Sequence, residues 1–167
     1  MSNKQILLKS RPSGWVSTDN FEVADAAIPE PGKGEMLLQA IFMSVDPYMR
    51  GRMNDVKSYV PPFQLGEPCQ AGLVSKVVAS NDGPHPVGTY LMGMGLWANY
   101  MVSNGDGFQP VQAGGVPLSY YLGILGMPGM TAYAGLKGVA ELKEGEQLFV
   151  SAASGAVGQV VGQIGKN

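Results

Sequence analysis

Glycine and alanine are concentrated in a turn close to the end of the printed sequence. The turn runs Ala153-Ser154-Gly155-Ala156-Val157-Gly158 and has the form A-x-G-x-x-G. A residue such as Gly155 lets the backbone approach a pyrophosphate, which is attracted by the free N–H groups and the positive end of a helix. Gly158 would let a helix and a strand pack closely together. The chemistry indicated by this spacing is the binding of a dinucleotide phosphate.

Such a turn needs a strand before it and a helix after it. The segment from Gln147 to Ala152 is apolar and is predicted to be a buried strand. A helix is predicted from Ala156 onward, with its apolar side formed by Val157, Val160, Val161 and Ile164. Alanine replaces the first glycine of the usual motif, so a second interpretation stays open: a small-residue turn before an ordinary α/β helix.

Charged side chains are sparse and almost balanced. The 167 residues include 11 Lys and Arg and 13 Asp and Glu, which gives a net charge of −2. This balance indicates neither a basic nucleic-acid surface nor an acidic tail. Lys4 and Lys9 bracket only a short apolar run, which is unlike a signal peptide. Gly, Pro and Gln interrupt the uncharged stretch 107–136, so we expect no membrane span. From the charge balance we expect no nucleic-acid partner.

The sequence contains one cysteine, Cys69, and one histidine, His85. A single cysteine excludes an intrachain disulfide and a four-cysteine zinc site, and it is consistent with a reducing cytoplasm. A catalytic zinc needs three protein ligands, and neither residue belongs to a recognisable ligand pattern. We therefore predict no metal and interpret Cys69 as a small buried apolar residue.

Short strands separated by glycine and proline turns are predicted over residues 1–115, which indicates a compact, mainly β domain. The clearest are Glu35 to Met43 and Ala71 to Ala79. Tyr90 to Met94 and Trp97 to Val102 are predicted to pair with each other around a glycine. The chain then becomes helical, so a domain boundary is expected near 112–117.

Three further helical segments are expected before the helix that begins at Ala156. The first follows Ser44-Val45-Asp46-Pro47, with Asp46 as the N-cap and Pro47 at the first helical position. The others are predicted over Leu118 to Leu125 and over Gly129 to Val139.

Three segments together resemble the medium-chain dehydrogenase/reductase superfamily: S-V-D-P-Y-M-R at 44–50, G-M-P-G-M-T-A-Y-A-G-L at 126–136 and A-A-S-G-A-V-G-Q-V-V-G-Q-I-G-K at 152–166. More narrowly, the sequence is similar to the zinc-independent leukotriene B4 dehydrogenase/prostaglandin reductase group, which includes plant alkenal reductases and bacterial curcumin reductases. Zinc-dependent relatives place a cysteine ligand near Ser44 and a Gly-His-Glu where Gly66-Glu67-Pro68 stands, so the resemblance also implies no zinc.

The resemblance implies a mainly β GroES-like barrel over residues 1–115, a helical connection over 116–146, and the first strand and helix of an α/β Rossmann domain over 147–167. It implies that the sequence is the N-terminal portion of a cytoplasmic protein that forms a homodimer. The implied reaction is the NADPH-dependent reduction of the C=C bond of an α,β-unsaturated ketone or aldehyde. A quinone reductase of the same superfamily and a non-catalytic fragment or binding module are the alternatives.

Tyr48 matches the family's tyrosine beside the nicotinamide and the substrate carbonyl. Its hydroxyl would donate to the enolate oxygen, although a packing tyrosine at a helix start is the alternative. The resemblance implies cofactor contacts from Pro47, Met127, Thr131, Gly155, Ala156, Val157, Gly158 and Gln159.

Several of these assignments have an ordinary structural alternative. Core packing explains Met127 almost as well, and Gln159 is equally typical of a solvent-facing helix position. Met94 and Trp97 are candidates for the substrate cleft, which an apolar barrel face explains equally well. Arg50 and Arg52 are open to interpretation as phosphate binders or as solvated or domain-bridging residues.

Overall fold

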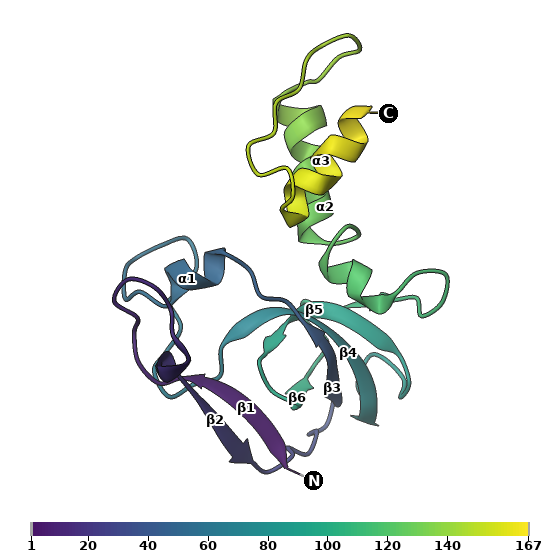
Figure 1. Ribbon diagram of the computed structural model, residues 1–167. Coiled ribbons are helices and arrows are strands. Elements are labelled where there is room, and N and C mark those ends of the chain that lie inside the picture. Colours follow the sequence, from purple (N-terminus) through teal and green to yellow (C-terminus); the bar gives the residue numbers. More distant parts are fainter. Residues whose placement is uncertain (1, 167) are drawn as a thin grey trace. The chain divides into compact units, whose positions relative to one another are not determined.

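The computed structural model describes residues 2–166 and divides into two compact units between Gln112 and Ala113. The first unit is built mainly from strands and the second from helices (Figure 1). Across residues 2–166, no helix combines the length and the apolar character that a membrane crossing requires.

Five strands form the larger sheet of the first unit, in the order β6-β3-β4-β5-β7. All neighbouring pairs in this sheet are antiparallel. The strands are β3 (Glu35–Met43), β4 (Gln70–Asn81), β5 (Tyr90–Leu96), β6 (Tyr100–Ser103) and β7 (Gln109–Val111). The predicted bounds of β3 are confirmed, and β4 extends beyond both ends of its predicted range.

The predicted pairing of Tyr90–Met94 with Trp97–Val102 is wrong. β5 pairs with β4 and β7, whereas β6 pairs with β3 on the far side of the sheet. The connection between them is bonded to the N-terminal strand, because the Ile6 N–H donates to the Trp97 carbonyl at 2.8 Å and the Asn99 N–H donates to the Lys4 carbonyl at 2.9 Å. A connection held in this way does not close a tight hairpin.

The smaller sheet consists of β1 (Asn3–Leu8) and β2 (Phe21–Ala26), which pair antiparallel (Figure 1). A short 3₁₀ helix, η1 (Thr18–Asn20), precedes β2. The other edge of β1 is also bonded, since the Leu8 N–H donates to the Glu67 carbonyl at 3.1 Å and the Cys69 N–H donates to the Ile6 carbonyl at 3.1 Å. β1 therefore joins the two-stranded sheet to the segments that flank β4 and β5.

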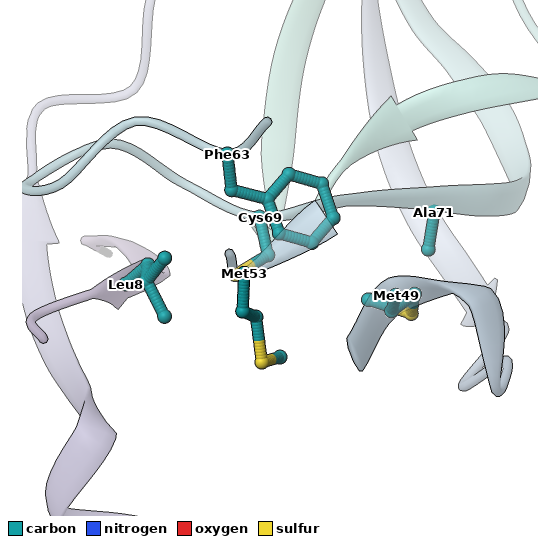
Figure 2. Packing of buried hydrophobic residues seen from close by; sticks show 6 residues of the cluster. All are labelled: Leu8, Met49, Met53, Phe63, Cys69 and Ala71. Carbon is teal, nitrogen blue, oxygen red and sulfur yellow. The ribbon is translucent and has the colours of Figure 1, made fainter. Parts of the chain in front are cut away.

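Two clusters of buried apolar side chains fill the first unit. The first cluster consists of Leu8, Met49, Met53, Phe63, Cys69 and Ala71 (Figure 2). The second consists of Met36, Leu38, Leu73, Val77, Leu91 and Phe108. Cys69 is 0% exposed, which confirms its interpretation as a small buried residue. Each fully buried large side chain contributes about 1.5–3 kcal/mol, so the first cluster holds the elements around it in place.

The first helix, α1 (Tyr48–Arg52), begins one residue later than predicted, with Pro47 rather than Asp46 as its N-cap. The Asp46 carboxylate does not cap the helix, because it accepts a hydrogen bond from the Ser44 hydroxyl at 2.6 Å. A helix of five residues has little stability of its own. Met49 and Met53, both buried in the first cluster, anchor α1 and so fix the position of Tyr48.

The second unit contains four helical elements: η2 (Leu118–Leu122), α2 (Met127–Ala134), a π-helical turn η3 (Gly135–Val139) and α3 (Ala156–Lys166). The helix predicted over Leu118 to Leu125 is confirmed as the shorter η2, and the helix over Gly129 to Val139 is divided between α2 and η3. α2 and α3 pack against each other (Figure 1).

The strand predicted over Gln147 to Ala152 is not formed. The segment is irregular to Val150 and continues as a turn, with Phe149 89% exposed and Leu148 40% exposed. A strand is stabilised by hydrogen bonds to a neighbouring strand and by burial of its faces, and residues 113–166 contain no strand to pair with it. The fold prediction is therefore confirmed for the mainly β part and for the helix, and is wrong for this strand.

Candidate functional site

A pocket with a volume of about 340 Å³ lies beside α1, wholly inside the first unit. The helix contributes part of its lining, and the loop that follows contributes the rest: Tyr48, Gly51, Arg52, Asn54, Val56, Lys57, Ser58, Tyr59, Val60 and Pro62. This volume is within the range of small-molecule sites. No motif in the sequence marks residues 54–62 as pocket residues, and the aromatic Tyr59 in a loop is the only signal there.

Tyr48 is one of three lining residues with a hydroxyl group, the others being Ser58 and Tyr59 in the loop. The Tyr48 side chain is partly buried and packs against the first core cluster. Burial raises the pKa of the Tyr48 phenol, Asp46 raises it further, Arg52 opposes the shift and Tyr59 adds to it. The phenol is therefore protonated at neutral pH, and a neutral hydroxyl is a hydrogen-bond donor. A donor at a partly enclosed apolar pocket is suited to stabilising negative charge that develops on an oxygen.

Arg52 connects the end of α1 to the far end of the pocket loop. Its guanidinium donates to the Pro61 carbonyl at 3.0 Å and to the side-chain oxygen of Gln70 at 3.0 Å. The same group lies over the Phe63 ring, 4.2 Å from the ring centroid. The Phe63 N–H donates in turn to the Arg52 carbonyl at 2.7 Å. These contacts do not support the interpretation of Arg52 as a solvated residue.

Arg50 connects the same helix to a different loop. Its guanidinium donates to the Gly14 carbonyl at 2.8 Å, to the Pro12 carbonyl at 3.1 Å and to the side-chain oxygen of Asn54 at 2.7 Å. A second pocket, of about 450 Å³, is lined by Gly14, Trp15, Val16 and Arg50. The two arginines are thus committed to carbonyl oxygens of the first unit.

Met94 and Trp97 do not line the pocket that contains Tyr48. Met94 lies on β5 and is 53% exposed. Trp97 packs against the first core cluster, and its ring centroid lies 6.3 Å from that of Phe21. Its indole N–H is buried and has no hydrogen-bond partner among residues 2–166. For Trp97 the structure favours the interpretation as part of the apolar barrel face.

The phosphate turn is present even though the strand before it is not. The Gly155 N–H donates to the Ala152 carbonyl at 2.9 Å, and the first bond of α3 runs from the Gln159 N–H to the Gly155 carbonyl at 3.0 Å. The N–H groups of Ala156, Val157 and Gly158 precede that bond, and such groups have no partner within a helix. A Cβ atom at Gly158 would overlap the Ala152 carbonyl oxygen, so only glycine fits there. The turn therefore fits an anionic phosphate.

Three other predicted cofactor residues also lie in the second unit. The Gln159 side chain folds back and donates to the Ser154 carbonyl at 2.6 Å. On α2, the Thr131 hydroxyl donates to the Met127 carbonyl at 2.7 Å. Met127 is 54% exposed, so core packing does not explain it. Pro47, in contrast, lies in the first unit beside Tyr48.

The described residues 2–166 contain no group of three His, Cys, Asp or Glu side chains arranged to hold a metal ion. Cys69 lies in an apolar cluster, and burial raises the pKa of its thiol while Arg52 opposes that shift. A protonated thiol is a poor metal ligand.

Residues 4–111 match the family described as the N-terminal domain of oxidoreductase. The chain belongs to this family. It is 45% identical over 166 residues to the NADPH-dependent curcumin reductase of Escherichia coli (strain K12), covering 98% of this chain and 48% of that protein. It is 43% identical over 172 residues to the 2-alkenal reductase (NADP(+)-dependent) of Nicotiana tabacum, covering 99% and 50%.

A solved structure of CurA in complex with NADPH from Vibrio vulnificus has a TM-score of 0.90 and 46% sequence identity, covering 98% of this chain and 48% of that one. The resemblance of this chain to the curcumin and alkenal reductases is confirmed. The GroES-like, mainly β fold is confirmed as well. The chain spans about half the length of the curated relatives that it matches.

Proposed function

We propose that the whole protein of this oxidoreductase family uses NADPH to reduce the C=C bond of α,β-unsaturated ketones and aldehydes, without zinc. The observation that carries the proposal is the protonated, partly buried Tyr48 at a pocket of about 340 Å³. The proposal is supported by relatives named for curcumin and alkenal reduction and by a similar structure that contains NADPH.

Tyr48 is the residue to which we assign catalysis. Bound NADPH would supply a hydride to the β-carbon of the substrate, which would leave negative charge on the carbonyl oxygen. The Tyr48 hydroxyl would donate a hydrogen bond to that oxygen, and solvent water would supply the proton added at the α-carbon. Since burial raises the pKa of Tyr48, the phenol keeps its proton across the neutral range and acts as a donor without transferring it.

The second unit supplies the cofactor contacts in this proposal. The N–H groups of Ala156, Val157 and Gly158 bind the pyrophosphate, where Gly155 keeps the turn open to the anion. Gln159, whose side chain already bonds to the turn, holds the turn in shape. Met127 and Thr131 are assigned to the nicotinamide. Pro47 is assigned to cofactor binding without a more specific contact.

The substrate site is assigned to the pocket that contains Tyr48, rather than to Met94 and Trp97, because neither of those residues lines it. In this protein the catalytic barrel spans 1–115, the connection spans 116–146 and the nucleotide-binding domain starts over 147–167. The whole protein is a cytoplasmic homodimer.

The test is a product analysis with the whole protein, NADPH deuterated at the transferred position, and an aryl enone. The proposal predicts a saturated ketone that carries deuterium at the β-carbon. A parallel reaction with a benzoquinone separates the quinone reductase alternative. Turnover of the quinone with no reduction of any enone would assign the other activity, and no oxidation of NADPH by either substrate would assign a non-catalytic module.

A further inference from the structure

The loop that walls the Tyr48 pocket has little packing of its own. Tyr59 is 91% exposed and Val56 is 58% exposed, although both line the pocket. A segment with few buried contacts opens locally at a low free-energy cost. Something other than apolar burial must therefore hold residues 54–62 in the position that encloses the pocket.

Arg50 contacts the start of the loop at Asn54, 2.7 Å away, and Arg11 contacts it at Asp55, 3.7 Å away. The far end of the loop is anchored by Arg52. Its side chain bonds to Pro61 and Gln70 and stacks on Phe63, and its carbonyl accepts from the Phe63 N–H. Phe63 is buried in the first core cluster, 3% exposed, so it provides a fixed point beneath the guanidinium. These contacts join both ends of the loop, because Arg52 lies two residues before Asn54 and Pro61 and Pro62 end the loop next to Phe63.

We propose that Arg52 is a positioning residue that fixes residues 54–62 as the wall of the substrate pocket and so limits the size of the enone that the pocket accepts. The size limit rests on the proposed function, whereas the anchoring of the loop does not. A planar guanidinium donates through its edge and stacks through its face at the same time. A lysine ammonium has no such face and would keep only part of this set of contacts.

Arg50 provides a matched control. It is an arginine on the same helix and donates to the backbone carbonyls of Pro12 and Gly14, and its one bond to the pocket loop goes to the Asn54 side chain at the start of that loop. Next to Gly14, Trp15 is 97% exposed. Chymotrypsin cleaves after aromatic residues, so Trp15 reports on the loop held by Arg50 and Tyr59 reports on the loop held by Arg52.

The first test is limited proteolysis of the 167-residue chain with chymotrypsin, followed by mass spectrometry. Arg52→Gln should accelerate cleavage after Tyr59 by about 10-fold or more, since cleavage follows local opening, and should leave cleavage after Trp15 unchanged. Arg50→Gln should accelerate cleavage after Trp15 more than cleavage after Tyr59, because Arg50 bonds to the pocket loop only at Asn54. Arg52→Lys should lie between Arg52→Gln and the parent. An unchanged rate after Tyr59, or equal acceleration at both sites in Arg52→Gln, would overturn the anchoring role.

The second test compares a short unsaturated aldehyde with a bulky aryl enone as substrates of the whole protein. Arg52→Gln should raise KM for the short substrate by about 10-fold and leave kcat nearly unchanged, as expected for lost ground-state positioning. KM for the bulky substrate should change less or fall. Equal losses for both substrates, carried by kcat, would overturn the size limit. A parent protein that reduces no enone would overturn the proposed function, while the proteolysis still decides the anchoring.

Discussion

The side-chain amide of Asn3 makes two hydrogen bonds to the backbone of Tyr100, donating to its carbonyl at 2.9 Å and accepting from its N–H at 2.9 Å. Asn3 is 1% exposed. The pair joins β1 of the smaller sheet to β6 at the edge of the larger sheet. A buried amide with both of its groups paired fixes the relative position of the elements that it connects. Leu8, at the other end of β1, belongs to the core cluster against which Tyr48 packs.

Substitution of Asn3 should therefore lower the stability of the folded protein. Asn3→Ala removes both partners of the Tyr100 backbone and should lower the free energy of unfolding by about 1–3 kcal/mol, the cost of buried polar groups left unpaired. Urea denaturation followed by circular dichroism measures this loss. Lys4→Ala is the control, because the Lys4–Asp25 ion pair is exposed and should contribute less than about 1 kcal/mol. Equal losses in the two variants would contradict the structural role of Asn3.

The Cys69 thiol should be unreactive in the folded protein. It is 0% exposed, and burial raises the pKa of the thiol, so the reactive thiolate is scarce in the folded state. Because the chain has one cysteine, a colorimetric thiol reagent reads this site alone. We expect labelling at pH 8 to be at least about 100-fold slower without urea than in denaturing urea, where the thiol behaves as a free cysteine.

The raised pKa of the Cys69 thiol also determines how the stability of the protein depends on pH. A thiol whose pKa is raised in the folded state stabilises the fold at pH values below its unfolded pKa. This contribution is lost as the pH rises through the folded pKa. Labelling of the native chain at the rate of a free thiol would show that the first core cluster is not closed around Cys69.

Strands that depend on local pattern were predictable, whereas strands that depend on distant partners were not. Glu35 to Met43 is predicted with its observed bounds because an apolar extended run between turn residues is a local signal. The pairing of β5 was not predictable from its neighbour in sequence, since the intervening segment bonds to β1, a strand far away in the chain. Gln147 to Ala152 has the apolar pattern of a strand but no partner strand among residues 113–166.

The candidate site shows the same division. Tyr48 and the turn from Ala153 to Gly158 both belong to recognisable motifs. The structure has a pocket beside Tyr48, and the N–H groups at the start of α3 follow the turn. The roles of Arg50 and Arg52 were not predictable from a motif, because several of their partners are backbone carbonyls, which every residue possesses. Contacts to the backbone leave no signature in a single sequence.

The exposed apolar residues before α3 should make the 167-residue chain associate. Phe149 is 89% exposed and Leu148 is 40% exposed, and exposed apolar patches favour association. Phe149→Ser should shift the chain towards the monomer in analytical ultracentrifugation at matched concentrations. Val87→Ser, at an exposed valine in the first unit, is the control and should leave association unchanged. Equal behaviour of Phe149→Ser and the parent would place the contact elsewhere.

Chelation should leave the activity of the whole protein intact. The positions at which zinc-dependent relatives carry ligands hold Ser44 and Glu67-Pro68 in this sequence, which do not supply the three ligands of a catalytic zinc. The measurement is the rate of enone reduction before and after exhaustive dialysis against a chelator. Loss of activity that added zinc alone restores would contradict the expectation.

The Tyr48 hydroxyl is the centre of this account, and removing it is the most direct test. In the whole protein, Tyr48→Phe keeps the ring that packs against the first core cluster and deletes the donor. With a saturating aryl enone, kcat should fall by about 10- to 1000-fold, as for the loss of one oxyanion donor, while KM for NADPH stays within about 2-fold of the parent value. An unchanged kcat for every enone that the parent reduces would contradict the assignment of catalysis to Tyr48.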